Sequence, residues 1–392
     1  MTPKDKDFSD LLLQTKLELA RPDLSARAAV LIHEHVPKGS LRIPTRHPAS
    51  ARTWLSALVM SVLPLLASAQ ESSDLVTGLQ KNVIFSAYSP LSGSLEVARR
   101  TLSPLANVEV ARASARLRPQ AVDLTHERFS VYVPAQRPSR GYALLAFIPP
   151  WEDARLPPAW APVLDENGVI FVSAAKSGNE ENVIDRRIPL ALLGAYNIMQ
   201  RYPIDPDRVY IGGFSGGSRV AMRTALAYPD LFRGALLNAG SDPIGGSEAL
   251  LPPDDLFAHF QSSTRLVYVT GSDDSWNIQH DMVSRDSMKA WCVFATRAET
   301  MLKVGHEAAT SYSLRRALST LDQRAPVDPE KLSACQARVA KELAADLRRV
   351  ADLIERDKPH DAWRSLTKLD IHYGGLAQSE SIQLEQRIGA RR

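Results

Sequence analysis

The chain has 392 residues, of which 44% are hydrophobic and 23% charged, as in an ordinary globular protein. That length can supply one large domain and a smaller one. The net charge is +3. Residues 1–69 contain nine of the 47 Lys and Arg residues and six of the 44 Asp and Glu residues. The rest of the chain therefore has 38 basic and 38 acidic residues. A body with balanced charge argues against nucleic acid as a partner, because phosphate binding needs a concentrated basic surface.

The N-terminal segment is predicted to lie outside the fold. Residues 1–51 are interpreted as a disordered leader or an over-extended start, 52–69 as a signal peptide and 70–81 as a linker. A basic flank, a short apolar run and the Ala-Ser-Ala that ends at residue 69 are the parts of a signal peptide, and the run is short for a membrane span. We expect a secreted or periplasmic protein that begins at Gln70. The alternative is an uncleaved membrane anchor.

No cofactor or metal is expected. His33 and His35 lie in the leader, where we do not interpret them as metal ligands. The sequence contains no zinc-type spacing, Walker loop or G-x-G-x-x-G motif.

The two cysteines, Cys292 and Cys335, are expected to form a disulfide if the protein is exported. The alternative is two buried free thiols. A bond would require their Cα atoms to lie within about 7 Å of each other.

Between residues 82 and 323, β-rich runs alternate with amphipathic stretches. This alternation predicts a mostly parallel sheet covered by helices on both faces, an α/β architecture. The continuous apolar runs are typical of inner strands of such a sheet. The expected strands lie at 122–134, 142–150, 168–175, 209–213, 232–240, 265–271 and 298–304, and the expected helices at 187–202, 217–227, 279–291 and 310–321. A helix break is expected at "PIDPDR" and a loop between the strands at 232–240 and 265–271.

Residues 329–392 are predicted to form a small helical appendage. From Lys331 to Arg356 the apolar residues recur at three- and four-residue steps, which indicates a helix. "AWRSLTKLDIHYGGLA" supplies a second helical element, and no strand pattern returns.

The stretch "RVYIGGFSGGSRVAM" places a serine among four glycines. Gly213 to Gly217 fits G-x-S-x-G, with a strand before it and a helix after it, which is the pattern of a nucleophile elbow. We therefore predict Ser215 as a nucleophile, with the N–H of Gly216 facing a developing oxyanion. The alternative is a serine that only caps the helix, and Ser218 is the weaker candidate nucleophile.

A serine on such an elbow needs an acid and then a histidine, in that chain order. Only His306, in "LKVGHE", directly follows the last predicted strand. The acid should follow "RLVYVTG", where the chain offers Asp273 and Asp274; we prefer Asp274, which lies further past the strand, and Asp273 remains the alternative. The other histidines of the body lie before the serine, before the last strand or in the appendage: His126, His259, His280, His360 and His372.

A second oxyanion donor should come from the loop after "YALLAFIPP". Pro149 and Pro150 have no N–H, so Trp151 or Glu152 would have to donate, and we assign Trp151. Trp151 and two further aromatic residues, Phe214 and Trp276, are neighbours of the predicted catalytic positions in sequence. They are candidates for lining the substrate pocket, with core packing as the alternative.

The stretch "RYPIDPDRVYIGGFSGGSRVAMRTALAYPDLFRGALLNAG" resembles the polyhydroxybutyrate depolymerase and feruloyl esterase type of α/β-hydrolase. The likeness runs from about Tyr142 to His306. It implies an α/β-hydrolase fold and exported ester hydrolysis without metal or organic cofactor, with Ser215, Asp274 and His306 as the triad. The sequence departs from that pattern at Ser218-Arg219, at "PPWED" and in the helical appendage, which puts the substrate in doubt more than the reaction.

The predicted function is that of an exported serine esterase that acts through an acyl-enzyme on a small-molecule or polymeric ester. Two alternatives stay open: a serine peptidase of the same fold and a non-catalytic binding protein on this scaffold. Neither nucleic acid nor stable membrane insertion after cleavage is expected, and the sequence leaves the oligomeric state open.

Overall fold

A computed structural model describes residues 76–114, 117–323 and 327–391. The predicted leader and signal peptide and the first residues of the predicted linker lie outside these ranges, as do His33 and His35. One eight-stranded sheet forms the centre, with strand order β1-β2-β4-β3-β5-β6-β7-β8. The strands are β1 (Gly78–Val83), β2 (Phe129–Val133), β3 (Tyr142–Ile148), β4 (Val169–Ala174), β5 (Ile204–Phe214), β6 (Gly234–Asn238), β7 (Arg265–Gly271) and β8 (Thr296–Met301).

The sheet is parallel from β4 to β8, and β2 pairs antiparallel with both β1 and β4. Helices connect the parallel strands, which places the carboxyl ends of β5, β7 and β8 at one edge. This order, with a sharp turn after β5, confirms the α/β-hydrolase fold predicted from the sequence. The helices of the hydrolase part are α2 (Ser94–Thr101), α3 (Pro104–Arg112), α4 (Ala161–Asn167), α5 (Ile188–Arg201), α6 (Gly216–Ala227), α7 (Asp254–Ser263), α8 (Ser275–Ala290) and α9 (Ser311–Asp322).

Side chains of successive strand residues alternate between two buried clusters. Leu145 and Phe171 pack with α4 and α9 on one face, whereas Leu144 and Val172 pack with α5 and α6 on the other. Both faces of the sheet are therefore covered, which explains why its inner strands consist almost entirely of buried residues.

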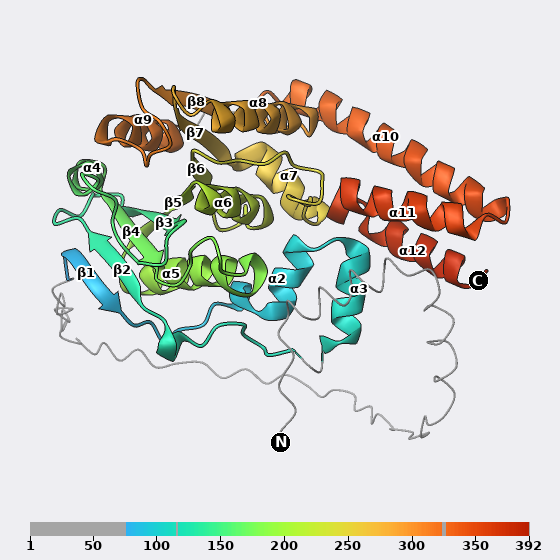
Figure 1. Ribbon diagram of the computed structural model, residues 1–392, viewed down its shortest axis with the longest axis horizontal. Helices are drawn as coiled ribbons and strands as arrows, with labels where there is room; N and C mark the ends of the chain where they lie inside the picture. The colour runs from blue at the N-terminus through green and yellow to red at the C-terminus, as the bar shows by residue number, and fades with distance from the viewer. Residues whose placement is uncertain (1–75, 115–116, 324–326, 392) are drawn as a thin grey trace, which may run out of the picture.

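The C-terminal helices α10 (Pro329–Glu355), α11 (Pro359–Tyr373) and α12 (Gln378–Gly389) form the group at one end of the molecule in Figure 1, away from α4 and α9. Their buried residues, such as Leu366 and Ile388, belong to the same hydrophobic cluster as α5 and α6. Gly375 donates its N–H to the carbonyl of Leu251, and α12 contacts α3. The predicted helical appendage is present and is packed against the hydrolase part.

A disulfide joins Cys292, just after α8, to Cys335 in the first turns of α10. Their Cα atoms lie 5.7 Å apart, within the range that a disulfide can bridge. The pairing expected from the sequence is confirmed, and the alternative of two free thiols is wrong.

Several sequence-predicted boundaries were wrong. The loop expected before β7 contains α7, whose buried residues include Phe257 and Phe260. The helix break expected at "PIDPDR" is present, since α5 ends at Arg201, but β5 already begins at Ile204, where it pairs with Tyr142, and not at residue 209. β1 begins at Gly78, inside the segment interpreted as a linker, because it pairs with β2. α8 begins four residues before the expected position, since Asp274 caps it.

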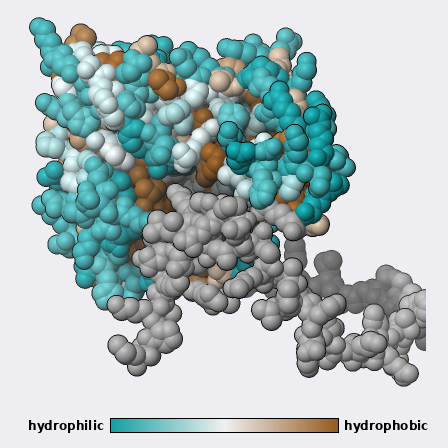
Figure 2. Space-filling view, turned by 45° about the vertical axis from the view of Figure 1, so that its right-hand side comes forward, coloured by the Kyte–Doolittle hydropathy of each residue, from teal (hydrophilic) through white to brown (hydrophobic). Residues whose placement is uncertain are grey.

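The visible surface in Figure 2 is mostly hydrophilic, and hydrophobic residues appear on it as separate patches. Within the described ranges, no helix has the length and apolar character needed to cross a membrane.

Candidate active site

Ser215 occupies a sharp turn between β5 and α6. Its backbone has φ 55° and ψ −124°, a conformation that a residue with a side chain rarely adopts. The turn is tight because a Cβ at Gly213 would lie 2.3 Å from the carbonyl oxygen of Gly217, and one at Gly217 would lie 2.0 Å from that of Ile148. Glycines are therefore required around the serine, as the sequence motif predicted.

The structure brings the three predicted triad residues together. His306 Nε2 lies 2.9 Å from Ser215 Oγ, and His306 Nδ1 lies 2.6 Å from Asp274 Oδ2. Each residue follows the carboxyl end of a parallel strand: β5, β7 and β8 respectively. The hydroxyl, imidazole and carboxylate thus form one hydrogen-bonded chain, in the geometry of a nucleophile, a base and an orienting acid.

Asp274 is buried and is held by α8 as well as by the histidine. Asn277 donates its amide N–H to Asp274 Oδ2 at 2.8 Å, and the backbone N–H of Asn277 lies 3.4 Å from Oδ1. Burial opposes ionisation, but the hydrogen bonds from His306 and Asn277 outweigh it and lower the pKa of the Asp274 carboxyl. Asp273 is exposed and accepts a hydrogen bond from Ser272 instead. The structure therefore favours Asp274 as the partner of His306.

Asn238, a fully buried residue at the end of β6, links the histidine loop to the nucleophile. Its side-chain amide donates to the carbonyl of Glu307 at 3.3 Å and accepts from the N–H of Ala309 at 2.6 Å. Its backbone carbonyl accepts the N–H of Ser215 at 2.8 Å. Sequence reasoning missed this residue, and the only available signal was a polar side chain in the buried run "GALLNAG".

Ser218, the weaker candidate nucleophile, is fully buried in the first turn of α6. Its hydroxyl donates to the carbonyl of Gly240 at 2.5 Å. This hydroxyl is engaged by the backbone and does not contact His306 in the described structure, so Ser218 anchors α6 to the loop after β6.

The loop after β3 is fixed by the buried guanidinium of Arg187. Arg187 Nη2 donates to the carbonyl of Pro149 at 2.9 Å, and Nε donates to that of Ser177 at 3.0 Å. The N–H of Asn179 also donates to Pro150 at 3.2 Å. These bonds hold the segment that carries Trp151 against the loop after β4 and the turn before α5.

The two predicted oxyanion donors are the backbone N–H groups of Gly216, the residue after Ser215, and of Trp151, in the loop after β3. Gly216 is the first residue of α6, where the first N–H groups have no acceptor within the helix. The carbonyl of Ile148, at the end of the strand that leads to Trp151, lies close to Gly217. Among the described residues, neither the N–H of Gly216 nor that of Trp151 has an acceptor.

The three predicted pocket aromatics lie in different surroundings. Phe214 is buried and packs between the rings of Trp151 and His306, with ring centroids 6.0 and 4.9 Å away. Trp276 is 60% exposed and lies over the guanidinium of Arg219 at 5.1 Å. Phe214 thus supports the imidazole from the core, whereas Trp276 faces solvent beside the acid loop.

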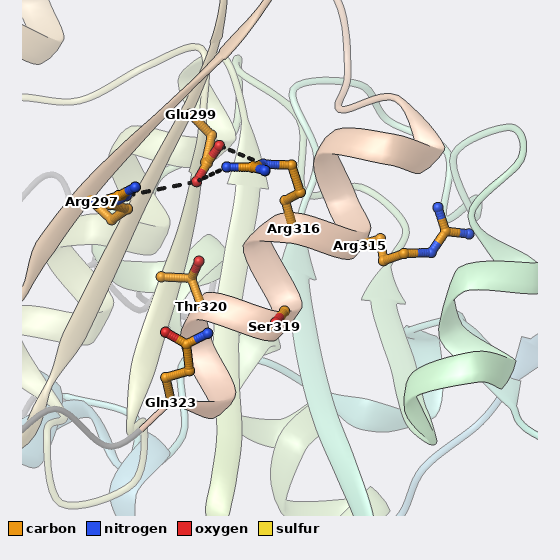
Figure 3. A pocket seen from close by; sticks show the side chains of 7 residues that line it. All are labelled: Arg297, Glu299, Arg315, Arg316, Ser319, Thr320 and Gln323. Atoms are coloured by element: carbon orange, nitrogen blue, oxygen red, sulfur yellow. Dashed lines mark hydrogen bonds and ion pairs between the residues drawn. The ribbon is translucent and has the colours of Figure 1, made fainter.

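A surface cavity of about 490 Å³ lies away from these residues, between β8 and α9 (Figure 3). Arg316 and Arg297 both lie against Glu299 there, and Arg315 pairs with Glu166. It contains none of the predicted site residues. Within the described ranges, no group of three or more His, Cys, Asp or Glu residues is placed to hold a metal ion.

No family model matches the chain. A poly(3-hydroxybutyrate) depolymerase of Ralstonia pickettii is 29% identical over 98 residues, which is 21% of this chain and 20% of the relative, so the chain spans about a fifth of that protein. A ferulic acid esterase aligns with TM-score 0.37 and 14% identity over 49% of this chain and 89% of its own. A putative dipeptidyl aminopeptidase IV of Bacteroides ovatus aligns with TM-score 0.38 and 12% identity over 51% of this chain and 34% of its own length.

The strand order and the elbow define this chain as an α/β-hydrolase fold. Its sequence likeness to a depolymerase is in line with the esterase type that the motif around Ser215 indicated.

Proposed function

We propose that the protein is a serine esterase. The observation that carries this proposal is the hydrogen-bonded chain from Ser215 through His306 to Asp274, on the sharp turn between β5 and α6. A helix cap would not need the serine side chain to contact an imidazole, and Ser215 does not cap α6 through its side chain.

In the proposed reaction, Ser215 Oγ attacks the carbonyl carbon of the ester while His306 Nε2 accepts the hydroxyl proton. Asp274 accepts the N–H of Nδ1, which fixes the tautomer that leaves Nε2 free and stabilises the imidazolium that forms. The lowered pKa of Asp274 keeps this carboxylate ionised at neutral pH.

The negative charge that forms on the carbonyl oxygen is stabilised by the N–H groups of Gly216 and Trp151. His306 then donates its proton to the leaving alcohol, and an acyl-enzyme on Ser215 remains. Water then attacks the acyl carbon while His306 accepts one of its protons. As the bond between the acyl carbon and Ser215 Oγ breaks, His306 returns this proton to Oγ, and the carboxylic acid is released. Arg187 acts only through the backbone here, because it holds the loop that carries Trp151.

A fluorophosphonate probe tests this proposal directly. It should label the wild-type protein and not Ser215→Ala, and a peptide map should place the label on Ser215. Absence of labelling in a folded wild-type protein would favour the non-catalytic binding protein. Turnover of 4-nitrophenyl esters compared with aminoacyl anilides then separates esterase from peptidase, and a screen over acyl, aryl and hydroxyacid polyesters identifies the natural ester.

We further propose that the protein is exported. The signal-like segment before Gln70 supports this, and so does the disulfide, because disulfides persist mainly in oxidising compartments.

Protein purified from the periplasm or the medium is expected to begin near Gln70, because a signal peptidase cleaves after the Ala-Ser-Ala. Intact-mass measurement checks this. A mass that retains residues 1–69 would contradict both the signal peptide and the localisation.

Reduction of the disulfide is expected to lower both the melting temperature and ester turnover. The bond closes a loop of 43 sequence steps that contains His306, and loop entropy gives an upper figure of about 4 kcal/mol for its stabilisation. Thermal melts and turnover with and without dithiothreitol measure the effect. A Cys292→Ser/Cys335→Ser variant is the control, since the reductant should not change it further. Unchanged melting and turnover in the reduced wild type, with both thiols alkylated, would refute the prediction.

A further inference from the structure

Two arginines follow the nucleophile on successive turns of α6. Arg219 and Arg223 lie four and eight residues after Ser215, which corresponds to about 6 and 12 Å along the helix axis. Arg219 is also one of the positions where the sequence departs from the esterases it resembles. Both side chains reach Asp242 in the loop after β6: Arg219 through Nη1 and Arg223 through Nη2 at 2.9 Å. One buried carboxylate therefore serves two guanidinium groups.

Several carboxylates lie near the arginines beside the site. Arg187 contributes a third guanidinium, which donates hydrogen bonds to carbonyl oxygens. The positive charge of Arg223 acts on this guanidinium. The carboxylates around the α6 arginines are Asp242, the largely exposed Glu248 that contacts Arg223, and Asp281, and Glu152 and Glu181 act on Arg187. Burial raises the pKa of Asp281, whose two oxygens accept hydroxyl donors from Ser241 and Thr270.

Both α6 arginines keep a buried donor without a partner. Arg219 Nη2 and Arg223 Nε have no hydrogen-bond acceptor among the described residues. A buried donor that forfeits its hydrogen bond is costly, and more so on a charged group. The two donors lie along one face of α6, on the side where Trp276 covers Arg219. This arrangement is expected if a bound anion accepts hydrogen bonds from both donors.

Arg223 also lines a cavity of about 480 Å³, which gives open space at the arginine end of α6. It lies between α2, α6, the turn before α5 and the loop before α7. Arg100 also lines it, but that guanidinium is already paired with Asp230 and Glu96. Its apolar lining includes Leu102, Val183, Ile184, Ile188, Leu250 and Ile371.

We propose that Arg219 and Arg223 bind a carboxylate carried by the substrate, so that the preferred ester has an aliphatic arm that ends in a negative charge. This proposal rests on the proposed function and names its substrate class. Arginine suits the role because its planar fork binds carboxylates with two parallel hydrogen bonds. An uncharged ester would leave both buried donors unpaired, which disfavours it relative to an anionic one.

Matched esters that differ only in this charge test the proposal. For the acyl arm, 4-nitrophenyl hydrogen adipate, pimelate and suberate are compared with their methyl esters, and release of 4-nitrophenolate is followed. For the alcohol arm, the butyrate ester of 6-hydroxyhexanoic acid is compared with that of its methyl ester, and release of butyrate is followed. The wild type should prefer the charged member of at least one pair by about tenfold or more in kcat/KM.

Arg219→Met and Arg223→Met should each lower this charged-to-neutral ratio by about tenfold, mainly through KM. Arg219→Lys should restore part of it, since it keeps the charge and loses the fork. Arg364→Met is the matched control, because Arg364 is an exposed arginine on α11 paired with Asp361, and its ratio should equal that of the wild type. Thermal melts identify any variant that fails to fold. If Arg219→Met does not fold, the charged-to-neutral ratio of Arg219→Lys tests the role of position 219.

Two results would overturn the proposal: no preference for the charged ester in either arm, or a preference that survives in folded Arg219→Met and Arg223→Met. In both cases Ser215-dependent hydrolysis of the neutral esters would leave the proposed esterase function intact. Absence of hydrolysis of every ester, together with absence of fluorophosphonate labelling, would instead refute the esterase itself. Calorimetry of suberate with Ser215→Ala supplies a reading that needs no turnover, and binding that Arg223→Met abolishes supports the site.

Discussion

Ser215→Ala is expected to lower turnover of an activated ester by roughly 10⁴-fold or more, while the protein remains folded. The hydroxyl contacts only the imidazole of His306 among the interactions described here, so its removal leaves the elbow and α6 in place. Residual turnover would come from the oxyanion donors and substrate binding alone. Burst kinetics with 4-nitrophenyl butyrate should show an acyl-enzyme in the wild type and none in the variant.

Ser218→Ala is the control for this prediction. Its hydroxyl is bonded to Gly240 and holds the first turn of α6, so the variant should lose some thermal stability and keep most of its turnover. Equal loss of activity in Ser218→Ala and Ser215→Ala would show that the elbow is assigned to the wrong serine.

The sheet could be predicted from the sequence because its signals are local. The run "GVIFVSAA" is apolar throughout, and Val169 to Ala174 is buried on both faces of the sheet. Length and turn residues then separated strands from helices. The strand at Gly78 and the helix at Asp254 could not be found in the same way, because their formation depends on partners distant in the sequence: β2 for the strand, and α6 for α7.

The triad could be predicted because the chain order of an α/β-hydrolase leaves few candidates. His306 was identified by its position after the last strand. The elbow was identified by its glycines, which are needed because the turn is too crowded for a Cβ. The supporting residues could not be predicted. Asn238 joins Ser215 to the histidine loop across about 70 residues of sequence, and Arg187 reaches carbonyls of a loop nearly 40 residues away. No local pattern records contacts of that range.

The choice between the two acids of "GSDDSWN" shows what sequence could and could not decide. Both carboxylates follow β7 and both have the same chemistry. What distinguishes them is burial and orientation: Asp274 turns inward to His306 and caps α8, whereas Asp273 remains at the surface beside Ser272. These differences arise from the packing of α8 against β7.

Asp274→Asn is therefore expected to lower kcat by about 10⁴-fold, and Asp273→Asn to change it little. An amide at position 274 can donate to His306 Nδ1, which stabilises the tautomer whose Nε2 carries a hydrogen and cannot accept the proton of Ser215. The amide also carries no charge, so the imidazolium loses its stabilising carboxylate.

The comparison is made at neutral pH with an activated ester, and a thermal melt of each variant separates loss of chemistry from loss of fold. Asp274→Asn should lose much activity and little melting temperature. The reason is that the amide oxygen can still cap α8 by accepting the backbone N–H of Asn277. As a second reading, fluorophosphonate labelling of Ser215 should slow in proportion to kcat, since both need the same proton transfer. A larger loss in Asp273→Asn than in Asp274→Asn would assign the acid to Asp273 and would contradict the hydrogen bond between Asp274 and His306 as the catalytic one.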